Sequence, residues 1–153
     1  MLKVFVLAMA LLATSAVATP KPPDFSADRR NIEAIFAAHD KLAPAIEEYM
    51  KSVADDIILM PNGGRMIEGK AAYRAHVKEF YESGSIQIRH EVIEVHSFPE
   101  VVIARGRAVG SFTPHGGGAV SAFETRNLFV FRRIADGSLQ IWQIIFNDAG
   151  RNQ

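Results

Sequence analysis

The stretch that decides the fold is ADDIILMPNGG, residues 54–64. Its centre, residues 56–60, is a short apolar run of the kind that forms a buried strand. Pro61 fixes one backbone dihedral angle and the Asn-Gly pair after it tolerates positive φ, so residues 61–64 predict a turn. The stretch therefore predicts a strand that ends in a turn, and the segments on either side of it supply the rest of the fold.

Helices are predicted on both sides of this strand. Upstream, apolar residues spaced by three and four positions predict a helix over 27–40. Pro44 suits the first turn of a helix, so a second helix is predicted over 43–52. Downstream, a third helix is predicted over 70–82, because one face carries the apolar stripe Tyr73, His76, Val77 and Phe80.

From residue 85 onward the pattern changes to β. Four runs joined by short Pro- or Gly-containing turns predict a strand meander, at residues 85–97, 101–112, 119–133 and 139–147. The first run needs a bulge between Arg89 and Val92, because its apolar residues change face there. The second has one face of small residues that lets the sheet bend, namely Ala104, Gly106, Ala108 and Gly110. Helices followed by a meander predict an α+β fold, with a helical layer packed on one face of a strongly curved antiparallel sheet.

The N-terminus predicts export. The chain has 153 residues, of which 48% are hydrophobic and none is Cys, enough for one domain. Residues 1–18 contain Lys3, an apolar run and Ala16-Val17-Ala18, the layout of a secretory signal peptide. We expect an extended lead-in over 19–25, a domain over 26–149 and a periplasmic or secreted location. The apolar run is too short to span a bilayer, so no stable membrane anchor is expected.

The charge balance limits the partners. The chain carries 17 basic and 17 acidic residues, and loss of Lys3 with the signal peptide leaves a net charge of −1. No excess of Lys and Arg is available to neutralise a run of phosphates, so nucleic acid is excluded as a partner. A small molecule or another protein is expected instead.

Several short stretches follow one another along the chain in an order that is typical of one protein superfamily. They are the strand and turn of 54–64 with Ile67-Glu68-Gly69-Lys70, then Gly106 to Phe112 with Gly116-Gly117-Gly118, and last Asp136-Gly137 leading to Asn147-Asp148. In this order the chain resembles the nuclear-transport-factor-2-like superfamily, which includes ketosteroid isomerase and the SnoaL-like polyketide cyclases. The resemblance implies a cone-shaped half-barrel that opens to an apolar pocket, often in a homodimer, and a membership that mixes enzymes with binding domains.

The chain also departs from ketosteroid isomerase at one important place. The resemblance implies an acidic general base just before the proline that ends the first strand. The corresponding residues are Leu59-Met60-Pro61-Asn62, none of which is acidic. Steroid isomerisation by that route is therefore not expected.

Three histidines are the candidate catalytic residues. His39 and His76 each occupy an apolar helical stripe, where a polar ring must be hydrogen-bonded or line a cavity. With the bulge, His90 faces inward and His96 faces outward. If His39, His76 and His90 converge on one cavity, they suit general acid/base catalysis; if they do not, they are hydrogen-bonded core residues. No histidine pair has a compact metal-binding spacing, so no metal is expected.

Six further residues are candidates for ligand binding, namely Tyr49, Met60, Tyr73, Glu124, Arg126 and Asn147. Glu124 and Arg126 share one strand face, where they could pair and orient a polar ligand group. The alternative is that Phe123, Phe129 and Phe131 face the core and the two charges are solvated. Asn147 ends the last strand, where a pocket mouth is expected.

Two functions follow from these expectations. The first is binding of a small, mainly apolar molecule, with cofactor-free acid/base chemistry of isomerase, cyclase or dehydratase type. In that case the three histidines move protons, and Arg126 or Asn147 polarises an oxygen. The alternative is a non-catalytic periplasmic ligand-binding or dimerisation module. Catalysis requires at least two titratable side chains near one point, whereas a carrier can have an almost wholly apolar wall.

Overall fold

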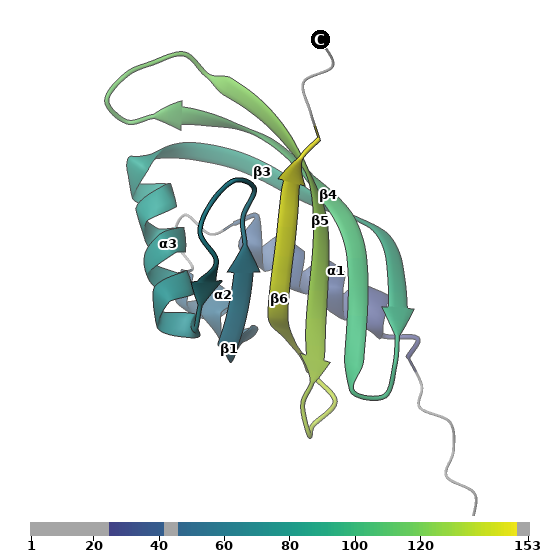
Figure 1. The fold of residues 1–153 in the computed structure, drawn as a ribbon. Coiled ribbons are helices and arrows are strands. Elements are labelled where there is room, and N and C mark those ends of the chain that lie inside the picture. Colours follow the sequence, from purple (N-terminus) through teal and green to yellow (C-terminus); the bar gives the residue numbers. More distant parts are fainter. Residues whose placement is uncertain (1–24, 42–45, 150–153) are drawn as a thin grey trace, which may run out of the picture.

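The computed structural model describes residues 25–41 and 46–149, which form three helices and six strands (Figure 1). The helices are α1 (Asp28–His39), α2 (Ile46–Lys51) and α3 (Lys70–Ser83). The strands are β1 (Val53–Met60), β2 (Ile67–Glu68), β3 (Gly84–Ser97), β4 (Val101–Pro114), β5 (Ser121–Arg133) and β6 (Leu139–Asp148). The predicted signal peptide, the lead-in up to residue 24 and the start of the second predicted helix lie outside the described residues.

The strands form one open sheet in the order β2-β1-β6-β5-β4-β3, and the helices pack on one face of it (Figure 1). The predicted α+β fold with a curved sheet is confirmed. The sheet is mixed rather than wholly antiparallel, because β1 pairs parallel to β6. The two-residue strand β2, which was not predicted, pairs with β1 at the edge. None of the helices among the described residues is both long and apolar enough to cross a membrane.

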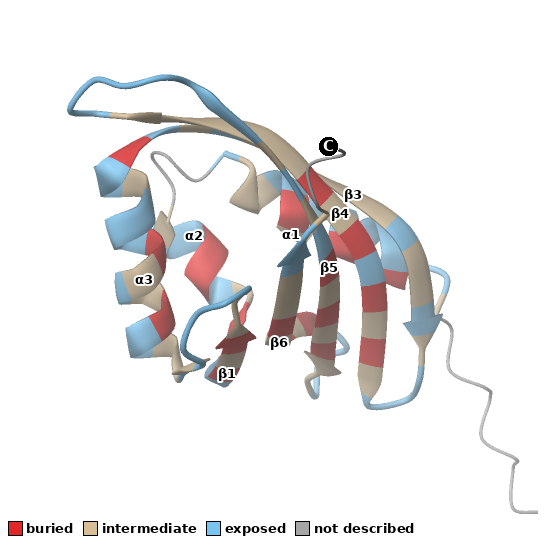
Figure 2. Ribbon diagram, turned by 45° about the horizontal axis from the view of Figure 1, so that its top comes forward, coloured by how far each residue is buried: buried red, intermediate tan, exposed pale blue. Residues whose placement is uncertain are grey.

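The core lies between the helices and the concave face of the sheet. Figure 2 shows buried and less buried residues alternating along β4 and β5, as expected for strands with one face on a core. Phe129 and Phe131 are buried on β5 and pack with Phe36 of α1. Burial of one such large apolar side chain contributes about 2 kcal/mol. The phenylalanine face of β5 is therefore the inward face, which leaves Glu124 and Arg126 on the outer one.

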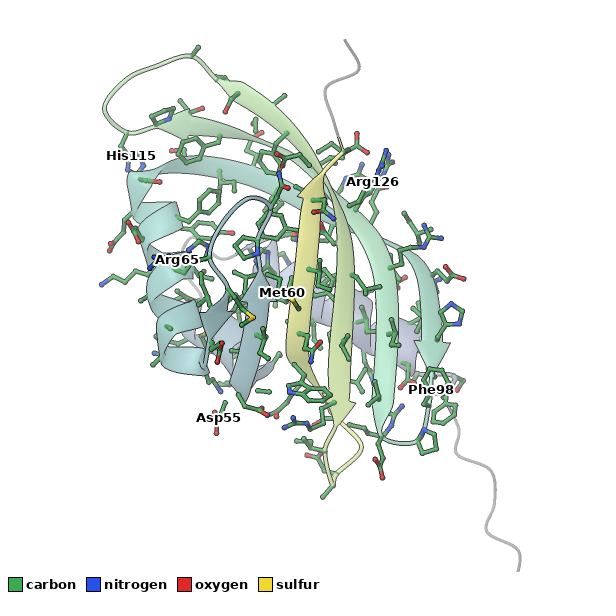
Figure 3. All side chains as sticks on the ribbon, viewed as in Figure 1. Asp55, Met60, Arg65, Phe98, His115 and Arg126 are labelled. Atoms are coloured by element: carbon green, nitrogen blue, oxygen red, sulfur yellow. The ribbon has the colours of Figure 1, made fainter. Side chains whose placement is uncertain are left out.

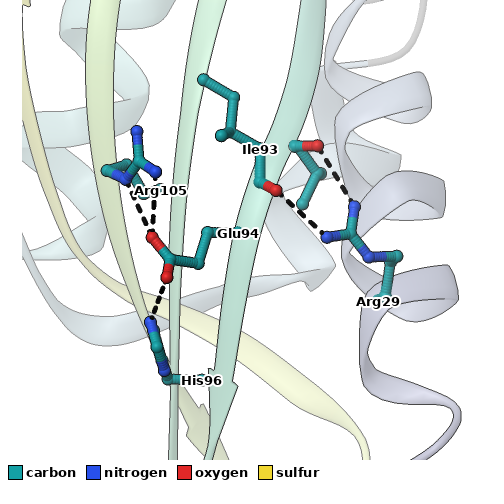
Figure 4. Close-up of polar contacts among 6 residues, drawn as sticks. Arg29, Ile93, Glu94, His96 and Arg105 are labelled. Carbon is teal, nitrogen blue, oxygen red and sulfur yellow. Dashed lines mark hydrogen bonds and ion pairs between the residues drawn. The ribbon is translucent and has the colours of Figure 1, made fainter.

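A bulge in β3 sets which of its side chains reach the interior. The pairing of β3 with β4 shifts between Val92 and Glu94, so the bulge is at Ile93 rather than between Arg89 and Val92. Arg29 of α1 donates hydrogen bonds to the carbonyl oxygens of Val92 (3.1 Å) and Ile93 (3.3 Å), as Figure 4 shows. These contacts satisfy the backbone at the bulge and hold it at this position.

The bulge separates two histidines as the pattern predicted. Before it, the His90 side chain faces inward and is 6% exposed. After it, the His96 side chain is 58% exposed and lies 2.9 Å from Glu94, which also accepts hydrogen bonds from Arg105 (Figure 4). The side assigned to each histidine is thus confirmed, although the bulge lies further along the strand.

Helix α1 is held against the sheet at both ends. At its start, Asp28 is 2% exposed and accepts two hydrogen bonds from Arg133 at the end of β5, at 2.8 and 3.0 Å. This contact raises the pKa of Arg133. At its end, Asp40 bonds to His90 in β3. Asp28 and Arg133 form a charged pair, so a substitution that removed Arg133 would leave the buried Asp28 carboxylate without this partner.

Glycines in β4 allow the sheet to curve. A Cβ atom on Gly106 would lie 2.5 Å from the carbonyl oxygen of Glu91 in β3. A Cβ atom on Gly110 would overlap the carbonyl oxygen of Gln87 and come within 2.7 Å of the Phe123 ring. Strands this close to one another leave no room for a side chain at either position, which explains the small residues on this face.

We predict that Gly110→Ala destabilises the domain by about 2 kcal/mol, because the added methyl group must displace backbone and a packed ring. Gly116→Ala is the matched control, since a Cβ atom there meets nothing within 4 Å. Urea unfolding of both variants measures the difference. Equal stability of the two variants would contradict the close approach of β3 and β4.

Candidate functional site

A cavity of about 400 Å³ lies between the concave face of the sheet and the helices. Aromatic side chains from one helix and three strands form much of its wall, namely Phe80, Phe112, Phe123, Phe129 and Phe146. The three candidate histidines, His39, His76 and His90, all line it, and so do Tyr49 and Tyr73. The structure therefore brings five of the nine residues selected from the sequence to one apolar cavity.

His90 is held by Asp40 through two hydrogen bonds. The His90 backbone N–H donates to one carboxylate oxygen at 3.1 Å, and ring Nδ1 lies 2.6 Å from the other. Burial acts to raise the pKa of Asp40, but the hydrogen bonds from the ring and backbone of His90 outweigh it, so the pKa lies below its ordinary value. An ionised carboxylate only accepts hydrogen bonds, so Nδ1 is the donor and neutral His90 has its lone pair on Nε2.

His39 lies beside this pair and is held in its neutral form. Burial, together with the nearby His90, lowers the pKa of His39 to about 3. Its ring packs edge-on against those of His90 and Tyr49, each at 4.7 Å between ring centres. Nδ1 of His39 has no hydrogen-bond partner among the described residues. His39 is therefore an uncharged polar ring at neutral pH rather than a cation.

Two tyrosines continue this row of rings. The hydroxyl groups of Tyr49 and Tyr73 are 2.8 Å apart, and both residues are buried. Burial raises the pKa of each one, so both stay protonated at neutral pH. One hydroxyl donates to the other, which leaves one proton of the pair for an acceptor in the cavity. The pair is suited to donate a hydrogen bond to a ligand oxygen.

Two more polar groups in the wall lack partners among the described residues. They are the Tyr81 hydroxyl and the side-chain oxygen of Asn127. Burial and the charge of Asp40 raise the pKa of Tyr81 to about 12, so its hydroxyl is protonated. A buried polar group without a partner costs about 1–3 kcal/mol, so a ligand that pairs with it gains affinity.

Four predicted ligand-binding residues do not line the cavity. Met60, Glu124, Arg126 and Asn147 lie on the outer face or at the end of the sheet, opposite in parity to the inward residues. Figure 3 shows Arg126 projecting beside the end of β6, and Met60 on the face of the sheet turned away from α1. Glu124 lies 3.6 Å from Arg107 on the outer face rather than pairing with Arg126. Glu124 and Arg126 therefore take the alternative position considered from the sequence, in which both side chains are solvated.

The last strand contributes a different residue from the one expected. Asn147 is exposed, whereas Asp148 lines the cavity and accepts a hydrogen bond of 2.9 Å from Asn62. The Pro61–Gly64 turn therefore lies beside the cavity. The residues missed in the sequence are Asp40, Tyr81, Asn127 and Asp148, and a signal existed for Asn127, which has the parity of Phe129 and Phe131.

The cluster His39, Asp40 and His90 also has the ligand types of a metal site, with atoms within 4.8 Å of one another. Ligands of one divalent transition metal are usually separated by about 3 Å or more, because each lies about 2 Å from the ion. The 2.6 Å contact between Asp40 and His90 is shorter and has the length of a charge-assisted hydrogen bond. In this geometry Asp40 and His90 are hydrogen-bonded to each other.

The family model of the SnoaL-like domain matches residues 29–143 of the chain. Among solved structures, a ketosteroid isomerase-like protein from Erwinia carotovora atroseptica is similar, with a TM-score of 0.74 and 20% identity over 86% of this chain and 100% of that one. A conserved protein from Planctomyces limnophilus has a TM-score of 0.73 and 18% identity over 80% and 98% of the two chains. These identities show a common fold. No curated protein matches the chain.

We predict that His39 makes the protein less stable in acid. Unfolded His39 takes up a proton near pH 6.5, whereas folded His39 does so only near pH 3. Between these values the unfolded state binds more protons, so the free energy of unfolding falls as the pH falls, by up to about 1.4 kcal/mol per pH unit.

The His39→Gln variant removes the titratable ring, so comparison with the wild type isolates the contribution of His39 to the pH dependence of stability. Urea unfolding of both proteins between pH 7 and pH 4 should show that the stability of the wild type, relative to the variant, decreases steadily below pH 6.5. A difference that does not change with pH would show that His39 is not held neutral in the fold.

Proposed function

The chain belongs to the SnoaL-like domain family, and from that premise we propose that it catalyses cofactor-free acid/base chemistry on a small, mainly apolar molecule. The reaction is of isomerase, cyclase or dehydratase type. The observation that supports this most directly is the Asp40–His90 pair, whose histidine lines the same cavity as the Tyr49–Tyr73 pair.

His90 is the proposed base. Asp40 orients its ring and stabilises the positive charge that forms when Nε2 takes up a proton. His39 is too strongly held in its neutral form to serve as the base. His76 lines the same cavity and is a second group that could move a proton. The three histidines therefore have different roles, although the sequence offered them as equivalents.

The tyrosine pair is the proposed hydrogen-bond donor. When His90 removes a proton from a carbon next to a carbonyl group, the C–H electron pair moves toward that carbonyl oxygen. The oxygen gains negative charge, which a hydrogen bond from Tyr49 or Tyr73 stabilises. Return of the proton to another carbon isomerises the substrate. Transfer of the proton to a hydroxyl group on the next carbon lets that group leave as water, while the enolate electrons form the new C=C bond. Protonated tyrosines take over the role expected of Arg126 and Asn147, both of which lie outside the cavity.

Exchange of carbon-bound hydrogen for deuterium tests this proposal without knowledge of the natural substrate. 2-Tetralone is a neutral bicyclic ketone whose protons next to the carbonyl exchange when an enolate forms. In deuterated buffer, the protein should accelerate this exchange above the buffer rate, as followed by NMR. Asp40→Asn should lower the acceleration at least about 10-fold, because His90 loses its charged partner.

Arg126→Ala is the control and should leave the rate unchanged, because Arg126 is exposed and outside the cavity. Saturable binding of 2-tetralone with no faster exchange would contradict catalysis and favour the alternative, a non-catalytic ligand-binding module. The largely aromatic wall of the cavity is the observation that favours that alternative.

We further propose that the protein works after export, as a homodimer. On the outer face of the sheet, Met60 of β1, Ile145 of β6 and Leu128 of β5 are register neighbours and form a small apolar area. These side chains are partly exposed in the single chain. Charged residues of β3 and β4 border this apolar area, including Glu94 and Arg105.

A charge placed in this area should prevent pairing. We predict that Leu128→Glu shifts the protein from dimer to monomer in light scattering coupled to gel filtration, because burial of an unpaired carboxylate is unfavourable. Lys78→Glu on α3 is the control, since Lys78 lies on an exposed helix face. A monomeric wild-type protein, or a dimer that survives Leu128→Glu, would contradict pairing through this face.

A further inference from the structure

We propose that Asp148 and Thr125 bind a protonated amine of the ligand at the rim of the cavity. The rim is the part of the wall that Asp148, Thr125, Phe123 and Phe146 form. This inference rests on the proposed function, because it adds a charged group to the mainly apolar molecule that the same cavity takes. None of the four rim residues has a role in the acid/base proposal.

Asp148 and Thr125 place two oxygen acceptors side by side. Both residues line the cavity, and they are directly opposite each other in the pairing of β5 with β6. Directly opposite side chains on one face of an antiparallel pair have Cβ atoms about 5 Å apart. A protonated amine has three N–H donors, so it can donate to the carboxylate and to the hydroxyl oxygen together.

The Asp148 carboxylate is oriented by a neighbour and can still accept further hydrogen bonds. Asn62 of the Pro61–Gly64 turn donates a hydrogen bond of 2.9 Å to Oδ2 of Asp148. A carboxylate has about four lone-pair sites, so this one bond leaves acceptor capacity for a ligand. A hydrogen bond between a cation and this carboxylate would be charge-assisted.

Two aromatic rings flank the pair of acceptors. Phe146 precedes Asp148 by two residues on β6, and Phe123 precedes Thr125 by two residues on β5. Because the two strands are antiparallel, Phe146 and Phe123 lie on opposite sides of the Asp148–Thr125 pair, and both line the cavity. Aromatic ring faces attract cations, so the rim suits a cation that is attached to an apolar group.

The charges of the wall favour a cation over an anion. No Lys or Arg is present among the described residues that line the cavity, and the one carboxylate in that set is Asp148. The amine belongs at the rim rather than deeper, because burial holds even the His39 ring neutral. Asp148 is exposed, so an amine beside it keeps part of its hydration.

The position of the amine also sets its distance from the proposed base. Thr125 is paired in register with Ala108, and Ala108 with His90, so two strand spacings separate Thr125 from His90. This separation is about 10 Å, because neighbouring strands lie about 4.8 Å apart. The ligand class is therefore a mainly apolar amine whose reacting carbon lies toward His90 and whose nitrogen lies toward Asp148.

Three naphthalenes of similar size test the inference by calorimetry on the purified protein at pH 7. 2-(Aminomethyl)naphthalene is a cation, 2-(hydroxymethyl)naphthalene is neutral, and 2-naphthoate is an anion. Wild-type protein should bind the amine about 5-fold more tightly than the alcohol, which is the preference expected from one exposed ion pair. 2-Naphthoate should bind most weakly of the three.

Substitution assigns the preference to the two acceptors. Asp148→Asn should remove the preference for the amine and leave the affinity for the alcohol nearly unchanged, because the new amide oxygen can still accept from Asn62. Asp55→Asn makes the same replacement on a side chain that is 96% exposed and outside the cavity, and it should keep the preference. Thr125→Val replaces the hydroxyl group with a methyl group and should lower the preference.

The outcomes separate this inference from the proposed function. Equal affinity for the amine and the alcohol, or a preference that survives Asp148→Asn, overturns the amine site and leaves acid/base catalysis standing. A preference unchanged by Thr125→Val overturns the role of Thr125, and tighter binding of 2-naphthoate than of the alcohol overturns the selection by charge. If no naphthalene binds, the inference fails, and the exchange of 2-tetralone decides separately whether the proposed function stands.

Discussion

The two hydrogen bonds between Asp40 and His90 are the contact on which the site depends. They join the end of α1 to the middle of β3, while Asp28 and Arg133 join its start to β5. With both ends held, α1 fixes His39 against the rings of His90 and Tyr49. The bond to Nδ1 also decides which ring nitrogen of His90 can take up a proton. The Asp40 carboxylate thus both holds the end of α1 against β3 and determines which ring nitrogen of His90 is free to accept a proton.

The cavity lowers the stability of the domain that contains it. Its wall includes polar atoms of His39, Tyr81 and Asn127 that have no partner among the described residues, each at a cost of about 1–3 kcal/mol. The aromatic and aliphatic core around them offsets this cost. Unpaired polar atoms in an apolar wall are what a site for a partly polar ligand requires, because the ligand supplies the missing partners.

Local patterns in the sequence were enough to predict most of the helices and strands and part of the candidate site. Apolar spacing placed His39 and His76 on inward helix faces, and the change of parity in β3 indicated a bulge that turns His90 inward. The exact place of that bulge was not predicted; there the backbone carbonyls bind Arg29, which is more than 60 residues away in the chain and so outside any local pattern. Asp40 was missed for the same reason, since its role appears only when α1 meets β3. The outward positions of Glu124 and Arg126 follow from β5 parity, which the sequence left undecided.

The protonation of the His90 ring tests the account most directly. Nitrogen-15 NMR of the histidine side chains reports which ring nitrogen carries the proton at neutral pH. We predict that Nδ1 of His90 is protonated and hydrogen-bonded, with Nε2 free, and that Asp40→Asn disturbs this state. A neutral ring with the proton on Nε2, unaffected by Asp40→Asn, would contradict an Asp40–His90 pair poised to accept a proton from a ligand.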